Sequence, residues 1–144
     1  HPPRVRILED MMRLLLGGTG EKEGVGTTDY GILVIEPDGR IDKNDTLKVA
    51  HAAADQFDRP WSIMRDPLDT FLASPAYDRY YRQQHALAED CKACSDLAVC
   101  GGGMVAHRYS QSRGFDNPTI FCADQRALIA DMRTVIARMS AKAA

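Results

Sequence analysis

The chain has 144 residues, a length that usually forms one domain with a sizeable buried core. Hydrophobic residues make up 44% and charged residues 26%, which excludes general disorder, and the net charge of -2 gives no basic surplus for nucleic acid. No apolar run approaches the roughly 18 residues of a membrane helix, and the first residues lack the layout of a secretion signal. We therefore expect a cytoplasmic protein that binds neither nucleic acid nor membrane.

The first 17 residues predict an amphipathic helix that ends at two glycines. Its apolar residues recur at helical spacing, at Leu8, Met12 and Leu15. Residues 17–28 are rich in glycine and charge, so we expect a mobile connector there.

A β-hairpin is predicted over residues 30–43. Residues 32–35 form a β-branched run, the turn residues Pro37, Asp38 and Gly39 follow, and a short strand returns. Nothing in this segment requires a catalytic role.

Helices are predicted over residues 66–89. Asp66 and Ser74 each precede a proline, which is the order of a capping residue and a first helical residue. The alanine-rich residues 49–57 also favour a helix, with a loop as the alternative. We interpret His51 and Trp61 as structural residues.

Several side chains of the second of these helices share one face. They are Tyr77, Tyr80, Tyr81, Gln84 and Leu87, with His85 beside them. A tyrosine stripe can line a peptide groove, but this spacing is more typical of core packing.

An amphipathic helix is predicted over residues 124–140, with Asp124 as its cap. It would begin two residues after Cys122. Because a helix start carries free N–H groups and positive partial charge, it is a favourable neighbour for an anionic metal–thiolate centre.

All four cysteines lie within residues 91–122, at Cys91, Cys94, Cys100 and Cys122. In a reducing compartment such clustering indicates metal ligands rather than disulfides. Zinc accepts four cysteines, but its sites usually use two close pairs, whereas Cys100 and Cys122 are far apart along the chain. Iron–sulfur clusters often combine one tight run with a distant ligand. The spacing alone leaves zinc and iron–sulfur open, with unrelated buried cysteines as a third alternative.

Three glycines, Gly101, Gly102 and Gly103, follow the third cysteine and favour the bulkier group. Without side chains their backbone can approach closely, adopt positive φ and direct N–H donors at sulfur. We expect them to surround the cysteine site.

The pattern Cys91-x2-Cys94-x5-Cys100, continued to Cys122, resembles the SPASM domain, the C-terminal extension of many radical S-adenosylmethionine (radical SAM) enzymes. The segments CGGG, HRY, GFDNP and FCAD are similar to those of the FxsB-like maturases of ribosomally made peptides, which include cyclophane-forming enzymes. The likeness covers most of the chain, including residues 34–49 and the opening helix.

This resemblance implies that Cys91, Cys94, Cys100 and Cys122 bind one auxiliary [4Fe-4S] cluster, with Zn²⁺ as the alternative. Where the family often has a further cysteine for another auxiliary cluster, this chain has Met104. The cluster would be fully ligated by protein and would leave no open iron for substrate. His107, Arg108 and Tyr109 are candidates for substrate contact or an electron path, although Arg108 paired with Asp116 or Asp124 would hold the same loop.

The resemblance also implies an α+β fold, with a small hairpin and several helices around a loop-rich cysteine site, as a single domain over residues 1–144. The catalytic Cys-x3-Cys-x2-Cys motif does not occur in the sequence. We therefore expect a fragment of a longer peptide-modifying oxidoreductase, or a module beside a partner. In either case the radical SAM barrel would hold S-adenosylmethionine and a second [4Fe-4S] cluster and would act on a precursor peptide. A zinc-stapled peptide-binding module and a standalone electron carrier are the alternatives.

Overall fold

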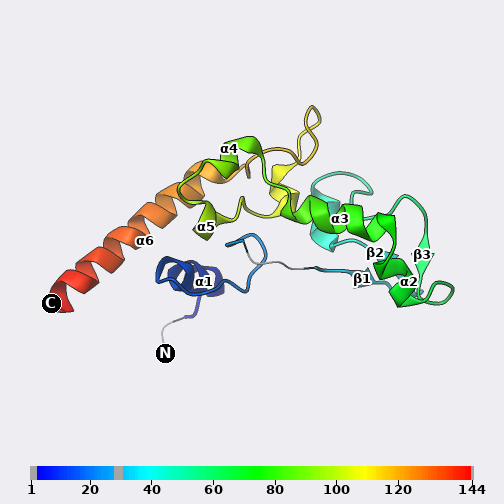
Figure 1. Cartoon of the computed structure of the whole chain (residues 1–144), viewed down its shortest axis with the longest axis horizontal. Helices are drawn as coiled ribbons and strands as arrows, with labels where there is room; N and C mark the ends of the chain where they lie inside the picture. Colours follow the sequence, from blue (N-terminus) through cyan, green and yellow to red (C-terminus); the bar gives the residue numbers. More distant parts are fainter. Residues whose placement is uncertain (1–2, 28–30, 144) are drawn as a thin grey trace.

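The computed structural model describes residues 3–27 and 31–143 and shows an elongated body of helices with a small antiparallel sheet (Figure 1). The helix α6 extends from one end, and the sheet lies with α2 at the other. In chain order the described elements are α1 (Arg6–Leu15), β1 (Val34–Ile35), β2 (Arg40–Asp42), η1 (Asp45–Val49), β3 (Trp61–Ser62), α2 (Leu68–Leu72), α3 (Pro75–His85), α4 (Glu89–Lys92), α5 (Leu97–Cys100), η2 (Val105–Arg108) and α6 (Cys122–Ala143). This mixture confirms the predicted α+β class.

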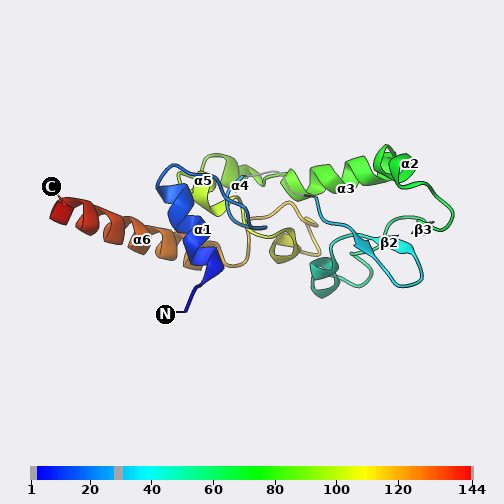
Figure 2. The ribbon, with the colours of Figure 1, turned by 90° about the horizontal axis from the view of Figure 1, so that it is seen from below.

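The helix α1 ends where the sequence predicts. Gly17 has a φ of +85°, and the N–H groups of Gly17 and Gly18 donate to the carbonyls of Leu14 and Arg13 at 3.1 and 2.9 Å. This is the double hydrogen bond of a Schellman cap, which satisfies carbonyls at the helix end. Figure 2 shows α1 beside α6, and α1 also packs on α5.

The predicted hairpin is present, and it carries a third strand. β1 pairs antiparallel with β2, with Ile35 opposite Ile41, and β2 pairs with β3, with Ile41 opposite Trp61. Tyr30, the first residue of the predicted segment, lies outside the described residues. The sequence did not indicate β3 because it is two residues long and follows Pro60.

The alanine-rich residues 49–57 are turns rather than the predicted helix. η1 ends at Val49, and Ala53 adopts a left-handed φ of +58°, which a continuous helix does not allow. The carbonyl of Asp55 then accepts a hydrogen bond from Lys43 N–H. Tertiary contacts to the sheet therefore override the helical preference of this segment.

Of the two predicted helix caps, Ser74 is confirmed. Its side chain accepts a hydrogen bond from Tyr77 N–H, and Pro75 is the first residue of α3. Asp66 does not cap α2, because its carboxylate instead accepts Ser62 N–H at 3.1 Å beside β3.

The tyrosine face packs into the core, as its spacing favours. Tyr80 is 2% exposed, and its hydroxyl donates to the carbonyl of Ile32 while accepting Asn44 N–H, both at 2.8 Å. Tyr77 lies against Phe71 and Tyr80. The helix itself ends at His85, before Leu87.

A separate core joins α1, α5 and α6. Its buried members are Met11, Val25, Val99, Cys100, Ile129 and Met132. The helix α6 begins at Cys122 itself, so Asp124 lies in its first turn instead of capping it. No helix in the described part of the chain is long and apolar enough to span a membrane.

Candidate metal centre

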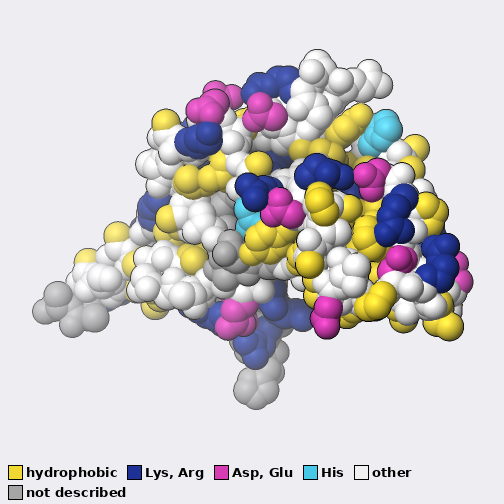
Figure 3. All heavy atoms as spheres, turned by 45° about the vertical axis from the view of Figure 1, so that its right-hand side comes forward, with side chains coloured by type: hydrophobic (Ala, Val, Ile, Leu, Met, Phe, Trp, Pro, Cys, Tyr) yellow, Lys and Arg dark blue, Asp and Glu magenta, His cyan; other side chains and the backbone are white. Residues whose placement is uncertain are grey.

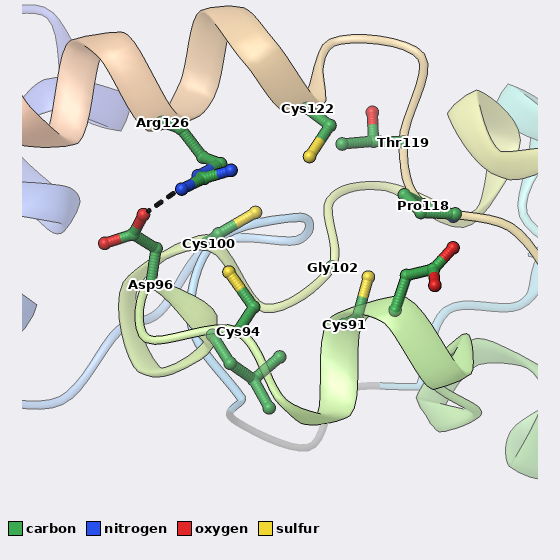
Figure 4. Close-up of a pocket in the computed structure, with 11 residues that line it drawn as sticks. Cys91, Cys94, Asp96, Cys100, Gly102, Pro118, Thr119, Cys122 and Arg126 are labelled. Atoms are coloured by element: carbon green, nitrogen blue, oxygen red, sulfur yellow. Dashed lines mark ion pairs between the residues drawn. The ribbon is translucent and has the colours of Figure 1, made fainter.

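All four cysteines line one cavity of about 190 Å³, and Figure 4 shows their sulfurs directed toward a shared space. Cys91 lies in α4, Cys94 in the turn after it, Cys100 at the end of α5 and Cys122 at the start of α6. The structure thus brings Cys122 beside the three cysteines of the tight run. The other lining residues are Asp90, Asp96, Leu97, Gly102, Pro118, Thr119 and Arg126.

Short helical turns fix the first three cysteines. Cys94 N–H donates to the carbonyl of Cys91 at 3.1 Å, and Cys100 N–H donates to that of Asp96 at 2.8 Å. These local bonds hold the backbone of the tight run, and the Cys100 thiol also donates to Gln125 Oε1 on α6 at 2.8 Å. Cys122 is different, because the loop from residue 110 to 121 must return the chain to the cavity.

The glycines after Cys100 adopt the left-handed conformation that the sequence predicts, with φ of +66°, +82° and +73°. Position 101 requires glycine for two reasons. Its φ is positive, and a Cβ there would lie 1.8 Å from the carbonyl oxygen of Gly26. Gly102 provides a backbone hydrogen bond to Cys100 that lowers the pKa of this thiol, against the larger effect of burial. The turn therefore combines close packing with an N–H donor at sulfur.

The glycine connector, residues 17–27, is packed rather than mobile. The buried carboxylate of Asp10 accepts the N–H groups of Glu21 and Lys22 at 2.7 and 3.0 Å. Val25 is 1% exposed, and Gly26 N–H donates to the carbonyl of Val99 at 2.8 Å. Thr28, the last residue of the predicted connector, lies outside the described residues. This prediction was wrong because the connector's hydrogen-bond partners lie on α1 and α5.

Burial raises the pKa of both Cys91 and Cys100, and the neighbouring thiols raise it further. For Cys91 the positive charge of Arg108 acts in the opposite direction. Four thiolates in one protein-lined cavity repel one another, and a multivalent cationic group removes this repulsion. The donor set therefore fits a metal centre ligated by cysteine thiolates.

Within residues 3–27 and 31–143, no three His, Cys, Asp or Glu side chains come close enough together to bind a single metal ion. Both groups that the sequence leaves open, a zinc ion and an iron–sulfur cluster, take four cysteine thiolates as ligands.

A charged network closes one side of the cavity and was not predicted. Asp96, 5% exposed, accepts Arg133 at 2.5 Å and lies 3.4 Å from Arg126. Arg126 is one helical turn after Cys122, so its guanidinium lies at the cavity wall (Figure 4). The signal in the sequence was the four-residue spacing between Cys122 and Arg126, which places both side chains on one face of α6.

His107, Arg108 and Tyr109 lie outside the lining of this cavity. The His107 ring contacts Phe121, and Tyr109 packs between His51 and Phe115.

Arg108 is buried and donates to the backbone carbonyls of Gln84 and Ala86. The predicted pairing partner Asp116 instead forms an ion pair with Arg113, and no such pair is seen for Asp124 among the described residues. Arg108 thus holds the loop, but through carbonyls at the end of α3.

The fold is SPASM-like, the class of auxiliary domain carried by radical SAM enzymes. The structure matches "Native anSMEcpe with bound AdoMet and Kp18Cys peptide" with a TM-score of 0.73 and 16% identity, over 95% of this chain and 36% of that chain. A second structure, "Native anSMEcpe with bound AdoMet", gives a TM-score of 0.70 and 18% identity over 92% and 35%. The chain therefore spans little more than a third of these neighbours. No protein-family model matches the sequence, and no curated protein matches it either.

Proposed function

We propose that this chain is the auxiliary [4Fe-4S] domain of a radical SAM enzyme that modifies ribosomally made peptides. Cys91, Cys94, Cys100 and Cys122 are the proposed ligands. The observation that carries the proposal is the meeting of these four thiols at one cavity in a SPASM-like fold.

The residues around the cavity fit this role. Four cysteine thiolates would occupy every iron of the cluster, so substrate would not bind to the metal directly. When bound, the cluster supplies a one-electron redox centre. The N–H of Gly102 and the guanidinium of Arg126 lie where they would stabilise negative charge on sulfur. The domain would carry electrons to or from the catalytic site, or hold the loops that cover it.

The remaining parts of the proposal concern the complete enzyme. Two of the neighbours hold AdoMet together with a peptide, which supports S-adenosylmethionine as cosubstrate and a precursor peptide as substrate. Both would bind to a barrel domain with its own [4Fe-4S] cluster, joined to this domain or acting beside it. Within this class, the CGGG and GFDNP segments favour the FxsB-like maturases.

His107 is the residue of the HRY segment that we propose contacts substrate or the electron path. Its ring lies against Phe121, next to Cys122. The variant His107→Ala should keep its iron while turnover of the complete enzyme falls. Unchanged turnover would end this assignment.

The ligand assignment is tested by anaerobic reconstitution of the whole chain with iron and sulfide. We expect about four irons per chain, broad visible charge-transfer absorption and a paramagnetic signal after one-electron reduction. Cys122→Ser should lose most of this iron, whereas Ser95→Ala, at the exposed neighbour of Cys94, should retain it.

The alternatives give different results in the same experiment. A zinc module would contain one zinc per chain, show no visible absorption and lose stability with chelators. A standalone carrier would show a reversible couple but no affinity for peptide. Absence of iron after anaerobic reconstitution, with zinc bound in its place, would refute the proposed cluster.

A further inference from the structure

A second hollow lies at the junction of α3 and the segment after β2, and its volume is about 270 Å³. It shares no lining residue with the cysteine cavity. Its lining residues are Lys43, Phe57, Asp58, Ala76, Arg79, Tyr80 and Gln83. The hollow therefore has aromatic walls and basic side chains in a part of the chain that the proposed cluster function does not use.

Lys43 is the unusual member of this hollow. Its ammonium lies over two rings, 5.5 Å from the centroid of Phe57 and 6.0 Å from that of Tyr80. Among the described residues no carboxylate lies within ion-pairing distance of it. Burial lowers the pKa of Lys43, with partial compensation from Asp58 and Asp55. Within the part of the chain that the structure describes, the ammonium is thus partly desolvated and has no direct counter-ion.

Further cations lie at the rim. Arg79 donates to Asp58 at 3.0 Å, and both side chains are exposed. An adjoining hollow shares Asp58 and Arg79 and contains Arg59, whose guanidinium lies 3.3 Å from the ring centroid of Trp61. Figure 3, which brings this end of the molecule forward, shows basic side chains among apolar ones with acidic groups between them. A ligand entering here meets cations fixed on aromatic faces.

We propose that this hollow binds a peptide carboxylate, with Lys43 as its counter-ion and the adjoining apolar atoms against Phe57 and Ala76. A carboxylate would accept hydrogen bonds from the ammonium and would restore the charge balance that burial disturbs. The aromatic contacts already restrict the Lys43 side chain, so little further ordering is needed on binding. A cationic ligand would be repelled by Lys43 and Arg79.

The proposal is tested on the full chain with three tripeptides of equal length, all blocked at the N-terminus. One carries a central glutamate and a C-terminal amide, one carries only a free C-terminal carboxylate, and one is neutral throughout. Binding is followed by amide chemical shifts in NMR spectra. We expect at least one carboxylate probe to bind with a dissociation constant on the order of 1 mM and the neutral probe to bind at least about tenfold more weakly. The stronger carboxylate probe identifies the source of the acid group.

Two variants separate the assigned contact from a general effect of charge. Lys43→Met should weaken carboxylate binding about tenfold or more, while Lys142→Met, at an exposed lysine of α6, should leave it unchanged. Asp58→Asn should strengthen binding several-fold, because it removes a like charge from the rim and releases Arg79. This gain cannot result from misfolding.

The binding measurements either support or overturn the assignment of Lys43. Carboxylate binding that is lost in Lys43→Met and improved in Asp58→Asn supports the assignment, whichever carboxylate probe is preferred. No binding of either carboxylate probe at about 10 mM, or equal binding by wild type and Lys43→Met, overturns it.

Discussion

Replacing Gly101 with alanine tests the close approach between the cysteine loop and the glycine connector. The φ of +66° at this position costs an L-residue roughly 1–2 kcal/mol. The new Cβ would also lie 1.8 Å from the carbonyl oxygen of Gly26, so backbone must move to accommodate it. Overpacking of this kind costs about 1–3 kcal/mol. We therefore expect Gly101→Ala to lower the free energy of unfolding by about 2–5 kcal/mol.

Gly114→Ala is the matched control. Gly114 also has a positive φ, +57°, but a Cβ there would meet nothing within 4 Å. Only the conformational cost applies, so the free energy of unfolding should fall by roughly 1–2 kcal/mol. The difference between the two variants therefore isolates the contact with Gly26.

Urea denaturation under anaerobic, reducing conditions provides the measurement. Trp61 is the single tryptophan and is buried in β3, which Figure 1 shows toward the other end of the body from α5 and α6, so its fluorescence reports global unfolding. Gly101→Ala should also hold less iron after reconstitution than Gly114→Ala, because the turn positions Cys100. Equal losses of stability in the two variants would refute the close approach.

Three further predictions concern charged residues. Arg126→Gln should retain iron but shift the cluster's reduction potential to a more negative value, because a cation beside the reduced cluster is lost. Voltammetry measures this potential, and Arg138→Gln, at an exposed arginine farther along α6, is the control. Asp10→Ala should lower the free energy of unfolding by about 2 kcal/mol and speed amide hydrogen exchange in the connector, because the N–H groups of Glu21 and Lys22 lose their acceptor. The control Asp131→Ala, on the exposed face of α6, should change neither quantity. Burial raises the pKa of Asp42, so the folded state favours the protonated carboxyl, and the stability that this group contributes below about pH 4 is lost as pH rises through the folded pKa. Asp42→Asn should therefore flatten this part of the curve of unfolding free energy against pH, measured by urea titrations. An unchanged curve would contradict the raised pKa.

Local signals predicted the parts of this protein that local chemistry controls. Gly17 and Gly18 end α1, Ser74 and Pro75 begin α3, and the turn residues before Arg40 form the hairpin. In each case the deciding hydrogen bonds or backbone angles lie within a few residues of the signal. The tight spacing of the first three cysteines belongs to the same category, because short helical turns hold them.

Tertiary structure decided the features whose partners lie far away in the sequence. A glycine-rich segment is ordered because Asp10 and Val99 supply its hydrogen-bond partners, and an alanine-rich segment turns at Ala53 instead of forming a helix. Arg126 reaches the cysteine cavity only because α6 begins at Cys122. Composition and spacing describe what each segment can do alone, whereas burial and hydrogen-bond satisfaction depend on which distant segment lies against it.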